Sequence, residues 1–125
     1  GEGYRLIGAS KISAEQKAQM LLVASQGQRE LCRGQGAELC WARTPMPLDQ
    51  RQVLDIFRKK TAPAFEVALR LGAIYAGVDQ HEEVEDVLKT YSEALGIAYQ
   101  IRDDLSDIGA SGETNDLAGL RPSLL

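Results

Sequence analysis

The chain has 125 residues, of which 44% are hydrophobic and 26% are charged, so its composition is that of an ordinary globular protein. Its formal net charge of −4 argues against a nucleic-acid partner, because nucleic-acid-binding domains usually carry a basic patch. No apolar run approaches the roughly 18 residues that a membrane-spanning helix requires. A chain of this length supports one core, so we expect residues 1–125 to form part of a single domain.

The patterns along the chain are those of helices rather than strands. Ser13 with Gln16 has the spacing of a capping box, which predicts a helix that begins there. Apolar residues then recur at helical spacing to about Ala42. Gly34 and Gly36 lie inside this helix and weaken it by up to about 1 kcal/mol each relative to alanine. Glycine at such a cost usually has a packing or access reason.

The first predicted helix also carries the two cysteines of the chain, Cys32 and Cys40. Eight residues along one helix separate them too widely for a disulfide. We therefore expect buried, reduced thiols, as in a cytoplasmic protein.

A second helix is predicted to begin after Asp49, with Gln52 at the capping-box position. Pro63 is expected to bend or restart this helix near Thr61. Gly77 has the position of a C-terminal stop. The basic run of residues 58–60 precedes the proline, and a cation with a hydroxyl at a helix break could hold a phosphate. Taken alone, a solvated basic patch is the more frequent reading of such a run.

The last long helix is predicted to follow a cap at Asp79 and to keep its apolar spacing up to Ile101. Successive helical residues turn by about 100°, which places four polar residues on one ridge. These are Gln100, Asp103, Asp104 and Asp107. A separate apolar stripe runs beside them through Ile97, Ile101, Leu105 and Ile108.

The acidic ridge can be read in two ways. Acidic residues on a helix most often form a solvated face, and composition alone favours that reading. Carboxylates one turn apart repel each other, however, and the helix dipole near a C-terminus adds to the penalty. A bound cation would offset both effects. Carboxylates without histidine or cysteine favour a hard ion, and Mg²⁺ commonly bridges them to a substrate phosphate.

Three motifs, taken in their order along the chain, favour the metal-binding reading of the acidic ridge. Gly34-Gln35 followed by Glu38, then Lys60-Thr61, then the segment from Gln100 to Asp107 resemble the second half of the trans-isoprenyl diphosphate synthases, the polyprenyl synthetase family. The resemblance extends from about Ser13 to Leu125. It implies an all-α antiparallel helix bundle of the isoprenoid synthase type around a central cavity, here incomplete. The first aspartate-rich motif and the final helices of the family have no counterpart in this sequence.

The resemblance also implies an activity. Members of the family are Mg²⁺-dependent prenyltransferases that condense an allylic diphosphate head-to-tail with isopentenyl diphosphate. A homodimer and a cytoplasmic location are expected on the same ground. Because part of the metal cluster lies outside these 125 residues, we expect this segment alone to be inactive.

The resemblance assigns roles to individual residues. Asp103 would bind Mg²⁺ directly, while Asp104 and Asp107 would act through water or orient the site. The residues that would act on the substrates are Lys60, Thr61, Gln100 and Arg121. Of these, Lys60 would grip the diphosphate, and Thr61 and Gln100 would direct oxygens toward the allylic cation. Arg121 occupies a position where the family usually has a diphosphate-binding lysine, so charge is kept but donor geometry differs.

Other functions remain open at this point. A class I terpene cyclase shares the helical fold and metal chemistry, although Lys60-Thr61 with Gln100 and its aspartates favours chain elongation. A non-catalytic helical subunit of a heteromeric synthase is an alternative of another class. A small helical protein without a ligand is the third.

Overall fold

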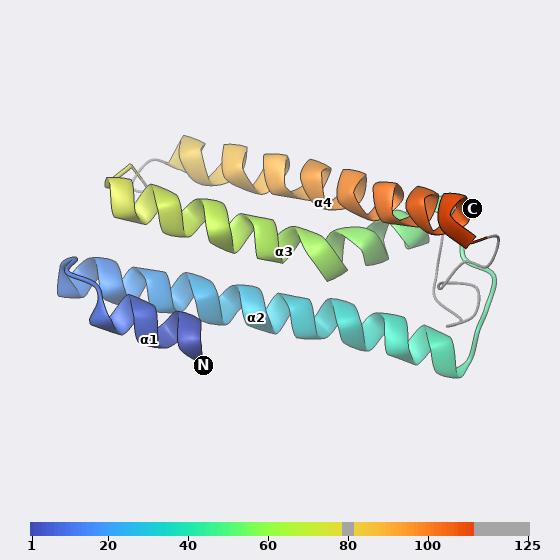
Figure 1. The fold of residues 1–125 in the computed structure, drawn as a ribbon, viewed down its shortest axis with the longest axis horizontal. Helices are drawn as coiled ribbons and strands as arrows, with labels where there is room; N and C mark the ends of the chain where they lie inside the picture. Colours follow the sequence, from blue (N-terminus) through green and yellow to red (C-terminus); the bar gives the residue numbers. More distant parts are fainter. Residues whose placement is uncertain (79–81, 112–125) are drawn as a thin grey trace.

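The computed structural model describes the backbone of residues 1–78 and 82–111, and the side chains of residues 1–78 and 83–106. Within these ranges the chain forms four helices and no strand, which confirms the all-α prediction. The helices are α1 (Glu2–Ala9), α2 (Ala14–Arg43), α3 (Gln50–Ala76) and α4 (Glu82–Ser111). The helix α3 lies between α2 and α4, and the short α1 lies alongside α2 (Figure 1).

The predicted ends of α2 and α3 are confirmed, whereas the cap predicted at Asp79 lies outside the described residues. Ser13 and Asp49 cap α2 and α3, and each forms a reciprocal capping box with the glutamine three residues on. The helix α3 ends at Gly77, whose φ of 73° is in the left-handed region that glycine adopts without a steric penalty. The amide of Val78 then donates to the carbonyl of Ala73. These caps fix where the long helices begin and end, and therefore which residues face one another.

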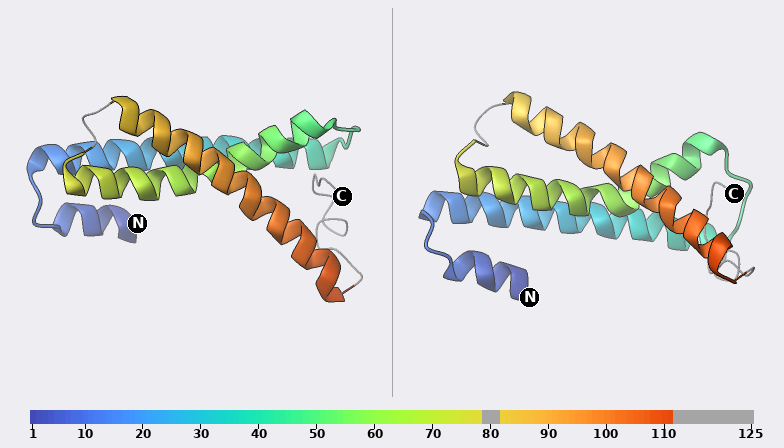
Figure 2. Two further views of the ribbon diagram at one scale, coloured as in Figure 1. Left: turned by 90° about the horizontal axis from the view of Figure 1, so that it is seen from above. Right: turned by 45° about the horizontal axis from the view of Figure 1, so that its top comes forward.

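The helix α3 is continuous through Pro63, so the helix bends there rather than restarting. The N-terminal part of α3 turns away from the line of the remainder (Figure 2). Proline has no N–H to donate, and its ring crowds the carbonyl four residues earlier, which belongs to Lys59. Lys60 and Thr61 therefore stand at a disturbed turn of the helix, as the sequence predicted.

The described core lies mainly along α3. Phe57 is only 2% exposed, and Val53 and Ala62 are buried on the same helix. A second cluster joins Ile74 to Met20 and Val23 of α2. Large apolar side chains also remain exposed on α4, among them Val87, Tyr91 and Leu105. None of the four described helices is long and apolar enough to cross a membrane.

The prediction that the cysteines are buried is wrong, because Cys32 and Cys40 are both exposed. The buried positions in this part of α2 are Gly34 and Glu38. Each cysteine lies two residues from one of these, a rotation of about 200° around the helix. The thiols therefore lie on the opposite side of α2 from the residues that it buries.

Candidate active site

A row of polar side chains crosses the three long helices at the bend of α3. Glu38 comes from α2, Lys60 and Thr61 from α3, and Gln100 from α4. The Nζ of Lys60 lies 3.1 Å from Oε1 of Glu38, and the hydroxyl of Thr61 donates to Oε1 of Gln100 at 3.3 Å. The structure thus brings together Lys60, Thr61 and Gln100, which the sequence singled out over a separation of forty residues.

Most polar side chains at this crossing are buried, while Lys60 and Thr61 are partly exposed. Glu38, Gln100 and Asp104 are 5%, 8% and 3% exposed, and among the described residues only Ser92 is a further buried polar side chain. The hydroxyl of Ser92 donates to the carbonyl of Leu88 on its own helix, as a helical serine commonly does. Burying polar and charged groups is unfavourable unless they are well partnered. Because burying several polar groups together is costly, their gathering near the bend of α3 indicates a functional site there.

The acidic ridge of α4 divides into a buried and an exposed part. The side chain of Asp103 is 42% exposed, with a carboxylate oxygen 3.6 Å from an Arg102 nitrogen, whereas Asp104 is buried. Asp107 lies within α4, but its side chain is outside the described residues. Among the side chains that are described, no three histidine, cysteine or acidic groups are gathered as a metal site. The assignment of these aspartates to Mg²⁺ stays a prediction.

The apolar stripe beside the ridge is less buried than the ridge itself. Leu105 is 56% exposed, while Gln100 and Asp104 are almost fully covered. The reason is that α4 turns its polar ridge toward α3, where Thr61 meets Gln100. Arg121, the other predicted diphosphate ligand, lies outside the described residues.

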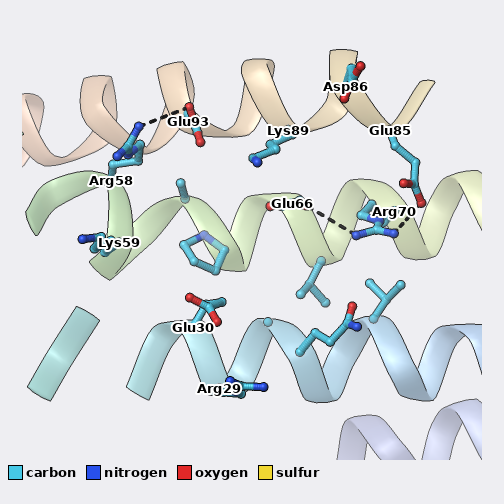
Figure 3. Close-up of a pocket in the computed structure, with 16 residues that line it drawn as sticks. Arg29, Glu30, Arg58, Lys59, Glu66, Arg70, Glu85, Asp86, Lys89 and Glu93 are labelled. Atoms are coloured by element: carbon cyan, nitrogen blue, oxygen red, sulfur yellow. Dashed lines mark hydrogen bonds and ion pairs between the residues drawn. The ribbon is translucent and has the colours of Figure 1, made fainter. Parts of the chain in front are cut away.

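An open groove with a volume of about 750 Å³ lies elsewhere on the described residues. It runs between α2, α3 and α4 and is lined by charges of both signs (Figure 3). Arg70 lies 2.6 Å from Glu85, and Arg58 lies 3.8 Å from Glu93 across this groove. Lys60 and Thr61 do not line it. Because its charges largely neutralise one another, the groove lacks the single sign of charge that a diphosphate site needs.

Arg58 and Lys59, the first two residues of the basic run, belong to a surface network instead. Both contact the carboxylate of Asp55, and Lys59 approaches it to 2.6 Å. The bond from Lys59 is the main cause that lowers the pKa of Asp55 below its ordinary value, and Arg58 adds to this against the opposing effect of partial burial. Arg58 and Lys59 are thus partly exposed and ion-paired on the surface, whereas Lys60 contacts Glu38.

The lowered pKa of Asp55 predicts a small dependence of stability on pH. A depressed folded-state pKa stabilises the fold above the unfolded pKa of about 4, and this stability is lost as pH falls through the folded value. The side chain is 37% exposed, so we expect Asp55→Asn to cost less than about 0.5 kcal/mol at neutral pH. Urea unfolding of both proteins between pH 7 and pH 2.5 would measure the difference, which should shrink toward the acid end. A constant difference across that range would contradict the assignment.

Two features of the site were not assigned a role from the sequence. Glu38 was noted as part of a motif but not as the partner of Lys60. The only available signal was its place one turn after Gly34, on the same face of one helix. Gly96 was not singled out at all, and the structure places it against the backbone of Ala62.

Comparisons with known proteins agree with this architecture. The sequence model of the family described as polyprenyl synthetase matches residues 3–117. The farnesyl diphosphate synthase of Haemophilus influenzae is 33% identical over 111 residues, which cover 86% of this chain and 37% of that protein. The farnesyl diphosphate synthase of Escherichia coli is 36% identical over 87 residues, 70% of this chain and 28% of that protein. The chain thus spans about a third of the length of the curated relatives that it matches.

Solved structures show the same arrangement of helices. A geranyltransferase from Helicobacter pylori, crystallised with magnesium and isoprenyl diphosphate, superimposes with a TM-score of 0.80 at 21% identity. That match covers 97% of this chain and 41% of the other. The geranylgeranyl pyrophosphate synthetase of Pyrococcus horikoshii gives a TM-score of 0.72 at 28% identity, covering 86% of this chain and 32% of the other. With its all-helical isoprenoid synthase fold and a family match over nearly its whole length, the chain belongs to the polyprenyl synthetase family.

Proposed function

We propose that this chain is part of a Mg²⁺-dependent prenyltransferase that joins an allylic diphosphate to isopentenyl diphosphate. The observation that carries the proposal is the polar row at the bend of α3. There, Lys60 and Thr61 meet the buried side chains of Glu38 and Gln100, contributed by two other helices. Relatives of this chain are farnesyl and geranylgeranyl diphosphate synthases, which supports the same reaction class.

The residues of the row suit the charges that develop in such a reaction. When the allylic carbon–oxygen bond breaks, the diphosphate takes the electron pair and becomes more negative, and the carbon skeleton becomes a cation. Lys60 would bind the departing pyrophosphate through its ammonium group. The oxygens of Thr61 and Gln100 would lie toward the cation and stabilise it. The isopentenyl double bond then attacks that cation, and loss of one proton restores a neutral chain.

The acidic ridge of α4 suits a magnesium site. Its side chains offer only oxygen donors, and the described residues around it contribute neither histidine nor cysteine. Oxygen-only sites favour hard cations such as Mg²⁺. Asp103, Asp104 and Asp107 would hold the ion, which would supply positive charge against the diphosphate oxygens. Arg121 would add a further cation toward that group.

The proposal predicts different behaviour for the segment and for the complete protein. We expect residues 1–125 alone to give no product from an allylic diphosphate, labelled isopentenyl diphosphate and Mg²⁺. The protein expressed at the full length that its gene encodes should form labelled polyprenyl diphosphate, and a chelator should abolish this. Robust turnover by the segment alone would refute the first expectation. Absence of turnover by the complete protein would overturn the proposed function.

A further inference from the structure

Two glycines, one on each neighbouring helix, lie against the backbone of α3 at the turn that carries Lys60 and Thr61. A β-carbon on Gly34 of α2 would lie 2.4 Å from the carbonyl oxygen of Lys59 and 2.8 Å from the amide nitrogen of Lys60. A β-carbon on Gly96 of α4 would lie 2.8 Å from the amide nitrogen of Ala62. All three distances are shorter than real β-carbon contacts, and backbone cannot swing aside as a flexible side chain can. Alanine at either position must therefore displace one helix against the other.

The turn between these glycines is also the least self-supporting part of α3. In an uninterrupted helix, the carbonyl of Lys59 would accept from the amide of residue 63, but Pro63 has no amide hydrogen. The local helix geometry therefore constrains residues 59–62 less than it does the rest of α3. Their position depends correspondingly more on the neighbouring helices that hold them from two sides.

We propose that Gly34 and Gly96 are positioning residues that set the location of Lys60 and Thr61 in the active site. Gly34 lets α2 approach closely enough for Glu38, one turn later, to reach Lys60 at 3.1 Å. Gly96 lets α4 approach from the other side, so that Gln100, one turn later, accepts from Thr61. In each case a glycine and a polar side chain four residues on form a pair that fixes one of the two residues. This inference rests on the proposed function.

The experiment measures binding of inorganic pyrophosphate in the presence of Mg²⁺ by calorimetry, with the protein at the full length that its gene encodes. We expect Gly34→Ala and Gly96→Ala each to weaken binding about tenfold, a smaller effect than the roughly 100-fold loss of rate that a ~1 Å misplacement of reacting groups can cause. If Gly34→Ala does not accumulate as folded protein, the milder Gly96→Ala carries the test.

Two other glycines of α2 serve as matched controls. A β-carbon on Gly36 meets nothing within 4 Å, so Gly36→Ala should leave both pyrophosphate binding and thermal stability intact or slightly improved. A β-carbon on Gly27 would clash with a side-chain methyl of Val67, 2.1 Å away. Gly27→Ala should therefore lower the melting temperature without changing pyrophosphate affinity. It distinguishes a general loss of packing from a loss of positioning.

The outcomes separate the inference from the function beneath it. If the unmodified protein binds pyrophosphate and Lys60→Gln weakens this, while Gly34→Ala and Gly96→Ala bind normally, the positioning role is refuted and the proposed function stands. Equal weakening by Gly27→Ala would also refute the positioning role. Failure of the unmodified protein to bind pyrophosphate would overturn both.

Discussion

Replacement of Lys60 by methionine is expected to lower the free energy of unfolding by about 3 kcal/mol. The ammonium lies 3.1 Å from the carboxylate of Glu38, whose side chain is only 6% exposed. Methionine keeps much of the length of lysine but leaves that carboxylate buried without its counter-ion. Removing one partner of a buried ion pair is costly for this reason, even where the pair itself adds little net stability. Urea unfolding of the protein at the full length that its gene encodes, followed by circular dichroism, would measure the loss.

A second substitution tests this explanation. Glu38→Leu combined with Lys60→Met removes both charges, so we expect most of the lost stability to return. The matched control is Arg33→Met, which breaks an ion pair with Glu30 on the same helix. Those two side chains are 60% and 51% exposed, and the expected cost is below about 0.5 kcal/mol. An equal loss in Lys60→Met and in the double variant would show that packing, rather than the orphaned charge, causes the effect.

The features of the fold that arise within a few residues could be read directly from the sequence. The capping boxes at Ser13 and Asp49 and the stop at Gly77 each depend on residues that lie close along the chain. The bend at Pro63 has a similarly local cause, the missing amide and the crowded carbonyl one turn earlier. The ends of α2 and α3 were therefore predicted to within about one residue, whereas α1 was not predicted and α4 continues to Ser111.

Features that depend on which helix face meets a neighbour were harder to predict. Spacing along α4 correctly placed Gln100 and Asp104 on one ridge, but it did not indicate which face of the helix would be buried. The structure covers the polar pair and leaves Leu105 exposed. Likewise, Cys32 and Cys40 were expected to be buried because cysteine usually is, yet α2 turns Gly34 and Glu38 inward instead. Side-chain identity gives a tendency, and the close approach of backbones decides the outcome.

In the candidate site, too, the residues could be predicted from the sequence, but not all of their contacts could. Lys60, Thr61 and Gln100 were singled out by motif, and the contact between Thr61 and Gln100 shows that the fold assembles two of them. That Glu38 pairs with Lys60 could not be deduced from spacing, because α2 and α3 are joined by a loop whose course sets the helix register. The ion pair between Glu38 and Lys60 depends on the close approach of Gly34 to the backbone of Lys59, which only the structure shows.

Substitution of Asp103 by asparagine is expected to reduce Mg²⁺-dependent turnover of the complete protein by about 100-fold or more. The change removes one negative charge and preserves side-chain shape. Because the side chain of Asp103 is 42% exposed, the melting temperature of the Asp103→Asn protein should differ little from that of the unmodified protein. Asp104→Asn alters a buried group, so it should lower turnover and stability together. Asp86→Asn, an exposed acidic position on the same helix, is the matched control and should keep full activity.

A magnesium titration separates metal binding from other roles of these aspartates. If Asp103 binds the ion, its asparagine variant should need a much higher Mg²⁺ concentration for half-maximal turnover, because a neutral amide is a weaker ligand than a carboxylate. Excess Mg²⁺ should then recover part of the lost rate, as it would not if the carboxylate served only to contact substrate. An Asp103→Asn protein that turns over normally at limiting Mg²⁺ would show that the ion is held elsewhere. The polar row at the bend of α3 would then have to be assigned a function without the acidic ridge beside it.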